Sequence, residues 1–325
     1  MPLTATKANI FPENYRGRLT EGVTYDPRTN ALLWIDIIAG KVHRVDASDG
    51  SNHELLKWTT PGESVGAIGL TSNPDIVLVC AKHGLAYGDF NKKTIEYFFR
   101  YPYSETQHAR LRSNDGIVDP WGNLWIGVMN DFPVGQTEGI QPEGALYRIT
   151  PDLKFDKMVD HSLILNGLGF NKTGDAFFWT DSLTFKIWKF DYDRATNTLS
   201  NRRPFVDLKA AYPDFESPEP DGFVMTDDGH IYTCVFSTSS ILHVDSEGKE
   251  VEKIKIDPAQ RITCVTIGGA DNDTFFITTG HLDLDNGDVV PDPNDLSGDL
   301  GGFLFKLTSG ANLHGQQKSI WGGKV

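Results

Sequence analysis

Short hydrophobic runs, rich in aromatic and β-branched side chains, recur along the chain between turn-forming residues. Residues 31–36 (Ala-Leu-Leu-Trp-Ile-Asp) are followed after a turn by a second run at 41–46, and the same arrangement returns at 176–181 and 186–191. Six-residue runs of this composition are typical of β-strands and too short for most helices. Weaker copies of the first run begin at Ile76, Asn123, His230 and Thr274.

The spacing of these runs predicts the architecture. The six copies follow one another at roughly 45 to 55 residues, a period typical of a propeller blade of about four short strands. A blade buries its faces only against neighbouring blades, so the repeat also predicts one cooperative unit. We therefore expect an all-β protein, a six-bladed β-propeller, in which residues 1–325 form a single domain. A β-sandwich or two stacked β-domains is the alternative.

Two segments interrupt the repeat. Residues 131–144 lack a strand pattern, as do residues 281–301, which are rich in Asp, Asn, Pro and Gly. Both are predicted to be long loops, and loops at the end of a propeller channel can cover a ligand site. Helical periodicity is almost absent, although residues 204–212 are compatible with a short turn of helix.

Composition narrows the possible partners. The net charge is −14, which disfavours nucleic acid and anionic lipid as partners. No apolar run approaches the roughly 20 residues of a membrane helix. The N-terminal residues lack the apolar stretch of a secretory signal, and three widely spaced cysteines indicate reduced thiols. We expect a cytoplasmic protein, a monomer or a small homo-oligomer, that contacts neither nucleic acid nor membrane.

Similar polar motifs stand in four of the repeats, each followed by an apolar strand. In a propeller that strand is the innermost one, so equivalent positions on different blades converge on the channel axis. Carboxylate and amide oxygens suit Ca²⁺, Mg²⁺ and Mn²⁺ and are compatible with Zn²⁺ and Fe²⁺. Asn-Gly and Asp-Gly are also the commonest tight-turn dipeptides, so a plain turn is the alternative for each. The motifs are Glu21-Gly22, Asn114-Asp115-Gly116, Asn166-Gly167 and Asp221-Gly222.

These motifs occur together with others that make the combination specific. From about Leu19 to Gly302 the sequence resembles the SMP-30/gluconolactonase/LRE-like family, which includes regucalcin and sugar lactonases. The resemblance implies a six-bladed propeller, in agreement with the repeat. The accompanying motifs are Tyr25-Asp26-Pro27, Trp34-Ile35-Asp36, Arg112 with Asp119-Pro120, Thr180-Asp181-Ser182, Pro220 and Gly301-Gly302-Phe303-Leu304-Phe305.

The resemblance also implies roles for individual residues. Glu21, Asn166 and Asp221 match the ligands of one divalent metal ion (Ca, Zn, Mn, Mg or Fe). Arg112 and Asn114 match residues that contact the substrate, and Asp221 also matches a general base. The implied reaction is hydrolysis of an aldono-1,4- or 1,5-lactone to the aldonic acid, with the metal polarising the lactone carbonyl. The residues leave open whether Asp221 or the metal activates the attacking water.

The chain departs from the common family pattern in two places near the motifs. Ile117 stands where many members have Lys, and Val128 stands where many have Thr. These differences concern which sugar is accepted rather than the ligand positions. The pocket-shaping candidates are Phe132, Phe185, Phe236 and His281.

Two functions other than catalysis also fit a propeller of this kind. One is a non-catalytic calcium-binding or regulatory protein, and the other is a platform for protein interactions. The presence of both Arg112 and Asn114 favours the sugar lactonase, because ion binding alone does not require them.

Overall fold

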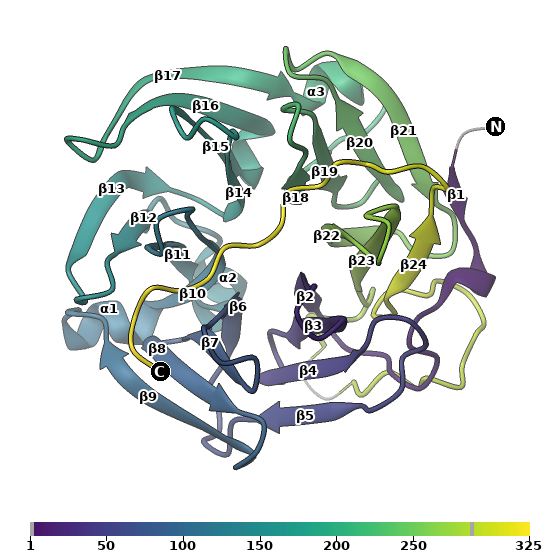
Figure 1. The fold of residues 1–325 in the computed structure, drawn as a ribbon, viewed down its shortest axis with the longest axis horizontal. Coiled ribbons are helices and arrows are strands. Elements are labelled where there is room, and N and C mark those ends of the chain that lie inside the picture. Colours follow the sequence, from purple (N-terminus) through teal and green to yellow (C-terminus); the bar gives the residue numbers. More distant parts are fainter. Residues whose placement is uncertain (1–2, 287–288) are drawn as a thin grey trace.

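The computed structural model describes residues 3–286 and 289–325. Within these residues, 24 strands form six sheets that are arranged as blades around a central axis (Figure 1). Apart from β1, the strands of each blade follow one another in chain order, with the first strand innermost and antiparallel neighbours outward. The predicted all-β, six-bladed propeller is therefore confirmed.

The first three blades have four strands each. Blade 1 consists of β2 (Thr20–Asp26), β3 (Ala31–Asp36), β4 (Lys41–Asp46) and β5 (Glu54–Lys57). Blade 2 consists of β6 (Val65–Leu70), β7 (Ile76–Ala81), β8 (Gly84–Asp89) and β9 (Thr94–Arg100). Blade 3 consists of β10 (Leu111–Val118), β11 (Leu124–Asn130), β12 (Gly144–Ile149) and β13 (Phe155–Ser162).

Blades 4 and 5 also have four strands from this part of the chain, and blade 6 has three. Blade 4 consists of β14 (Leu165–Phe170), β15 (Ala176–Asp181), β16 (Lys186–Asp193) and β17 (Thr198–Asp207). Blade 5 consists of β18 (Pro220–Met225), β19 (Ile231–Val235), β20 (Ser240–Val244) and β21 (Glu250–Ile256). Blade 6 consists of β22 (Arg261–Gly268), β23 (Thr274–Gly280) and β24 (Phe305–Thr308). The recurring hydrophobic runs correspond to the second strand of each blade.

The N-terminal segment pairs with blades 5 and 6 before the chain enters blade 1. Strand β1 (Thr4–Ala5) pairs in parallel with β21 and adds an outer strand to blade 5. Ile10 then forms a bridge to Phe305 in blade 6. The guanidinium of Arg16 donates hydrogen bonds to the carbonyl oxygens of Asp295, Asp299 and Gly301, so this segment also fixes the loop that follows β23.

Helices are few and short. The segment 131–144, predicted to be a loop, contains α2 (Phe132–Glu138), which begins where the Asp131 carboxylate accepts from the Phe132 amide. Helix α1 (Glu105–Arg110) was not predicted; it begins with a capping box formed by Ser104 and Gln107. Helices of this length are too short to show a periodic hydrophobic pattern, so the capping residues are their main sequence signal. The other helical segments are α3 (Leu208–Ala211), η1 (Lys7–Asn9) and η2 (Ser182–Thr184).

Residues 204–212 and 281–301 were the remaining segments without a clear strand pattern. Residues 204–212 were expected to hold a turn of helix, and they contain the end of β17 followed by α3. The described part of 281–301 carries neither helix nor strand, as predicted, and residues 287–288 lie outside the described residues. No helix in the described part of the chain is long and apolar enough to cross a membrane.

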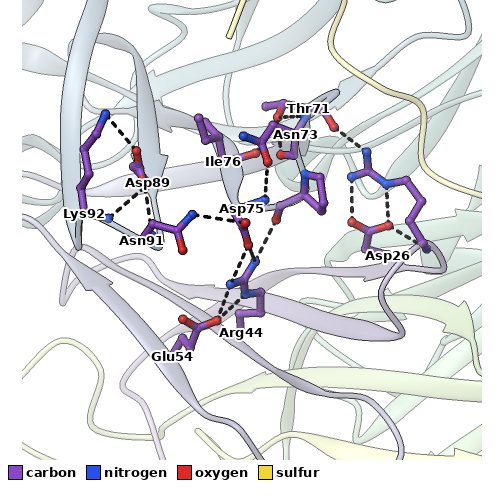
Figure 2. A network of polar contacts seen from close by, with 12 residues as sticks. Asp26, Arg44, Glu54, Thr71, Asn73, Asp75, Ile76, Asp89, Asn91 and Lys92 are labelled. Carbon is purple, nitrogen blue, oxygen red and sulfur yellow. Dashed lines mark hydrogen bonds and ion pairs between the residues drawn. The ribbon is translucent and has the colours of Figure 1, made fainter.

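Polar contacts supplement the apolar packing between blades. In Figure 2, Arg44 of β4 contacts Glu54 of its own blade and Asp75 in the turn that precedes β7. Asp75 also accepts from Asn91 at 3.2 Å. The Arg44 guanidinium lies 4.0 Å from the centre of the Phe90 ring, which adds a cation–π contact. Blades 1 and 2 are thus joined near their outer edges as well as at the axis.

Each innermost strand carries a β-bulge near its beginning. A bulge inserts an extra residue on one strand and turns its side chain away from the regular alternation. In β2 the pairing shifts between Glu21 and Thr24, and in β14 it shifts between Asn166 and Leu168. The corresponding shifts in β6, β10, β18 and β22 occur between Val65 and Ala67, Ser113 and Gly116, Pro220 and Phe223, and Ile262 and Val265.

Glycine at these bulges permits the inner strands to pack closely around the axis. A Cβ atom on Gly66 would lie 2.4 Å from the carbonyl oxygen of Ser113, and one on Gly167 would lie 2.7 Å from that of Asp221. Both contacts are to backbone, which cannot rotate out of the way. The glycines therefore set the spacing between neighbouring inner strands.

Gly66→Ala is expected to destabilise the fold by about 2 kcal/mol, because the added methyl group overpacks the contact between β6 and β10. Chemical denaturation measures the change. Gly280→Ala is the matched control: its Cβ would lie 3.3 Å from the flexible end of the Leu19 side chain, and we expect less than about 1 kcal/mol. Equal effects of the two substitutions would contradict the packing argument.

Candidate functional site

A cavity of about 460 Å³ opens at the end of the channel where the inner strands begin. All five residues predicted from the sequence line it: Glu21, Arg112, Asn114, Asn166 and Asp221. They come from β2, β10, β14 and β18, at or beside the bulges. The sequence motifs thus lie within the inner strands rather than before them, and they are not tight turns. The structure brings the five side chains together, while their individual roles remain predictions.

A chain of hydrogen bonds connects three blades across the floor of the cavity. Arg112 Nη1 donates to Asn114 Oδ1 at 2.7 Å, and Asn114 Nδ2 donates to Asn166 Oδ1 at 2.8 Å. Asn166 Nδ2 donates to Ser182 Oγ at 2.9 Å, and that hydroxyl donates to the carbonyl oxygen of Pro220. The chain fixes both amide groups. Because a carbonyl oxygen has two lone pairs, Asn166 Oδ1 can still accept a second partner.

Two buried carboxyl groups lie close together beside this chain. Burial, followed by the nearby Asp115 carboxylate, raises the pKa of Glu21 to about 8. Burial, and then the Glu21 and Asp115 carboxylates, hold the pKa of Asp221 well above its ordinary value. Glu21 Oε2 accepts from the Gly22 amide at 2.6 Å. Asp221 Oδ1 is buried and has no hydrogen-bond partner among the described residues.

This arrangement fits an oxygen-liganded divalent cation. An unpaired buried carboxylate oxygen is costly, and two neighbouring carboxylates repel each other, so a cation between them would relieve both effects. The candidate ligands are the carboxylates of Glu21 and Asp221 and the amide oxygen of Asn166, which are hard donors. No group of three or more His, Cys, Asp or Glu side chains suited to a metal occurs in the part of the chain that the structure describes. The proposed set differs from such groups because its third ligand is the amide oxygen of Asn166.

Arg112 provides the positive charge of the cavity. Its guanidinium lies 4.3 Å from the centre of the Phe132 ring, and Nη2 is 3.3 Å from Met129 Sδ. Burial lowers its pKa to about 10, so the group stays charged at neutral pH. Within the described residues, Nε is buried without a hydrogen-bond partner. One donor of this cation is therefore available for a ligand.

The walls combine apolar and acidic side chains. Phe132 and Phe236 line the cavity, as predicted, whereas Phe185 and His281 are not among its lining residues. Asp131 at the start of α2 forms an ion pair with Lys82 at 2.5 Å. The end of α2 is fixed by Arg110, which pairs with Glu138 at 2.9 Å. The lining residues that the sequence interpretation did not name as candidates are Leu19, Ile37, Met129, Asn130, Asp131, Gly135, Gln136, Ile140, Ile164, Ser182, Glu219, Leu284 and Asp285.

Two of these lining residues lie in or beside a sequence motif that could have identified them, whereas others do not. Ser182 ends a motif that belongs to the resemblance, and Glu219 stands two positions before Asp221. The residues of α2 and of the loop after β23 carry no motif, and their place in the wall depends on how those segments fold over the channel.

Known proteins resemble this chain in sequence and in fold. A family model described as the SMP-30/Gluconolactonase/LRE-like region matches residues 19–281. The cell growth-regulated gene 1 protein of Candida albicans is 61% identical over 341 aligned residues and covers 100% of both chains. A pentonolactonase of Haloferax volcanii is 28% identical and covers 89% of this chain and 90% of its own length. The crystal structure of regucalcin from Agrobacterium tumefaciens, described as a calcium-binding protein, superposes with a TM-score of 0.79 at 20% identity and covers 99% of each chain, which supports the fold.

Proposed function

Because the chain belongs to the SMP-30/gluconolactonase/LRE-like family, we propose that it hydrolyses a sugar lactone, using one divalent metal ion held by Glu21, Asn166 and Asp221. The observation that carries the proposal is the meeting of these three side chains with Arg112 and Asn114 in one cavity. The pentonolactonase relative supports the substrate class. A volume of about 460 Å³ suits a five- or six-carbon lactone.

The reaction adds water to the lactone carbonyl carbon and breaks the bond between that carbon and the ring oxygen. The ring oxygen leaves as a hydroxyl group, and the product is a hydroxy acid. When bound, a divalent ion supplies Lewis-acid polarisation of the carbonyl. Asp221, in its carboxylate form, accepts a proton from the attacking water.

The remaining residues hold the substrate in place. Arg112 donates to a ring or exocyclic hydroxyl oxygen of the sugar, since both N–H groups of Nη1 are occupied but Nε has no partner in the described structure and Nη2 contacts only the weak acceptor Met129 Sδ. Asn114 is held by Arg112 and Asn166 and keeps the floor of the cavity rigid. Phe132 and Phe236 cover the less polar C–H surface of the ring and reduce access of bulk water. Positioning of this kind lowers the barrier by reducing the entropy lost in the reaction.

A panel of aldono-1,4- and 1,5-lactones, followed with a pH indicator, tests the proposal. The protein is first treated with a chelator, and Ca²⁺, Mg²⁺, Mn²⁺, Zn²⁺ or Fe²⁺ is then restored singly. We expect turnover of one or a few lactones, lost on chelation and recovered with metal. Metal binding without turnover of any lactone would instead support a non-catalytic ion-binding role.

A further inference from the structure

The C-terminal segment, residues 309–325, closes the end of the channel opposite the candidate site. In Figure 1 it runs from β24 past the inner strands of blade 5 and across the centre of the ring to blades 2 and 3. Gly315 bridges Thr226 after β18, and the Trp321 amide donates to the carbonyl oxygen of Leu70 at the end of β6. These contacts are at the C-terminal ends of the inner strands, whereas the cavity lies at their beginnings.

The segment is firmly attached on both sides of the axis. Trp321 is 1% exposed and packs in the core shared by blades 2 and 3. Its indole Nε1 donates to the Tyr87 hydroxyl at 3.1 Å, and the Gly322 amide donates to the Gly122 carbonyl oxygen at 3.0 Å. The residues between Gly315 and Trp321 are therefore held across the channel.

Lys318 lies in this held stretch and reaches a small axial cavity. The cavity has a volume of about 20 Å³, enough for one water molecule. Among the described residues that line it, Asp115 is the single carboxylate and Lys318 the single ammonium group. Lys318 makes no ion pair within 4.0 Å in the described structure, so the two charges interact through space or through solvent rather than by direct contact.

Asp115 connects this end of the channel to the candidate site. It follows Asn114 in β10, and its Oδ1 accepts from the Gly116 amide at 2.7 Å. Burial raises the pKa of Asp115, and the Lys318 charge opposes that rise. Gly22, whose amide donates to Glu21 Oε2, lines the same small cavity as Asp115, and Asn114, the residue before Asp115, donates to Asn166 Oδ1. The three carboxylates therefore form one electrostatic group, with a lysine on the far side from the cavity.

We propose that Lys318 is a positioning residue whose ammonium group partly neutralises Asp115 and thereby sets how tightly Glu21 and Asp221 bind a divalent cation. The C-terminal segment holds this charge at the axis. In the ion-free protein the lysine offsets repulsion between Asp115 and the other two carboxylates, and in the ion-bound protein a partly neutralised Asp115 attracts the cation less strongly. Lys318 thus stabilises the ion-free form and weakens ion binding. This inference rests on the metal-dependent function proposed above.

Lys318→Met in the full-length, chelated protein tests the inference. Titration calorimetry with Mn²⁺ is expected to show a Kd roughly three- to tenfold lower than that of the wild type, as expected when one unit charge leaves a partly buried site. The ion-free Tm is expected to fall, while the Tm rise on adding Mn²⁺ grows. A merely structural role would weaken Mn²⁺ binding instead. Lys318→Arg is expected to behave like the wild type, and so is Lys324→Met, an exposed lysine of the same segment.

Asp115→Asn supplies a second measurement that does not depend on how well Lys318→Met folds. Alone, it is expected to weaken Mn²⁺ binding, and in its background Lys318→Met is expected to have little further effect, because the two charges act as a pair. An unchanged or higher Kd in Lys318→Met, or a full effect of that substitution without Asp115, would overturn the inference. So would a wild type that binds none of Mn²⁺, Ca²⁺ and Zn²⁺. Tighter Mn²⁺ binding by Lys318→Met without turnover of any lactone would keep the inference and remove the proposed reaction.

Discussion

Asp221→Asn is expected to lower kcat/KM for lactone hydrolysis by about a thousandfold or more. The substitution removes both a proposed metal ligand and the proposed proton acceptor. Steady-state kinetics on the best lactone of the panel measures the loss. Near-normal activity would eliminate Asp221 as a base and as an essential ligand.

Stability should change in the opposite direction. Asp221 Oδ1 has no partner in the described structure, and the carboxylate lies near Glu21 and Asp115. Replacing it with a neutral amide relieves repulsion, so the Tm in the presence of chelator is expected to stay the same or rise. The Tm increase produced by metal should largely disappear, because that increase reports binding to the folded state. A large fall in Tm would indicate that Asp221 is needed for folding.

Asp119→Asn is the matched control. Asp119 is a buried carboxylate in the turn after β10, and it accepts from the amides of Trp121 and Asn123 and from Trp125 Nε1. Its hydrogen bonds are satisfied within blade 3, so its substitution is expected to lower Tm and leave kcat/KM of the folded protein nearly unchanged. The pair of variants separates a carboxylate that stabilises the fold from one proposed to act in the reaction.

Arg112→Met is expected to raise KM roughly 10- to 100-fold, the effect of losing a charged hydrogen bond to the substrate. Methionine keeps an apolar contact with Phe132, which limits the structural change. The metal-dependent rise in Tm should remain, because Arg112 is not a proposed ligand. Kinetics and thermal unfolding with and without metal measure the two effects.

Two further variants define what Arg112 contributes. Arg112→Lys keeps the charge but loses the planar group that donates to Asn114 and Ser113, so it should recover only part of the affinity. Arg100→Met is the control for losing an arginine–aromatic contact: Arg100 lies over Tyr97 on β9, away from the cavity, and its substitution should leave KM unchanged. Loss of the metal-dependent Tm rise in Arg112→Met would mean that the metal lies elsewhere in the cavity.

The repeat of strands could be predicted because its signal is local. Runs such as 31–36 and 176–181 carry the strand composition within six residues, and the turn residues that precede them are equally local. Helices α1 and α2 escaped prediction because capping residues, rather than periodicity, begin them. The candidate residues were found because Glu21, Arg112, Asn114, Asn166 and Asp221 stand in motifs that resemble those of a known family.

The sequence by itself determined the six-fold strand pattern, the all-β class and the identity of the polar residues beside each inner strand. The tertiary structure decided what those residues experience. A bulge depends on the register between two strands, and register depends on the whole blade, so the motifs lie within the inner strands rather than in turns. Burial at the axis raises the pKa of Glu21 and Asp221, and burial is set by all six blades together. The position of Lys318 near Asp115 arises because the end of the chain crosses the completed ring, which no local pattern encodes.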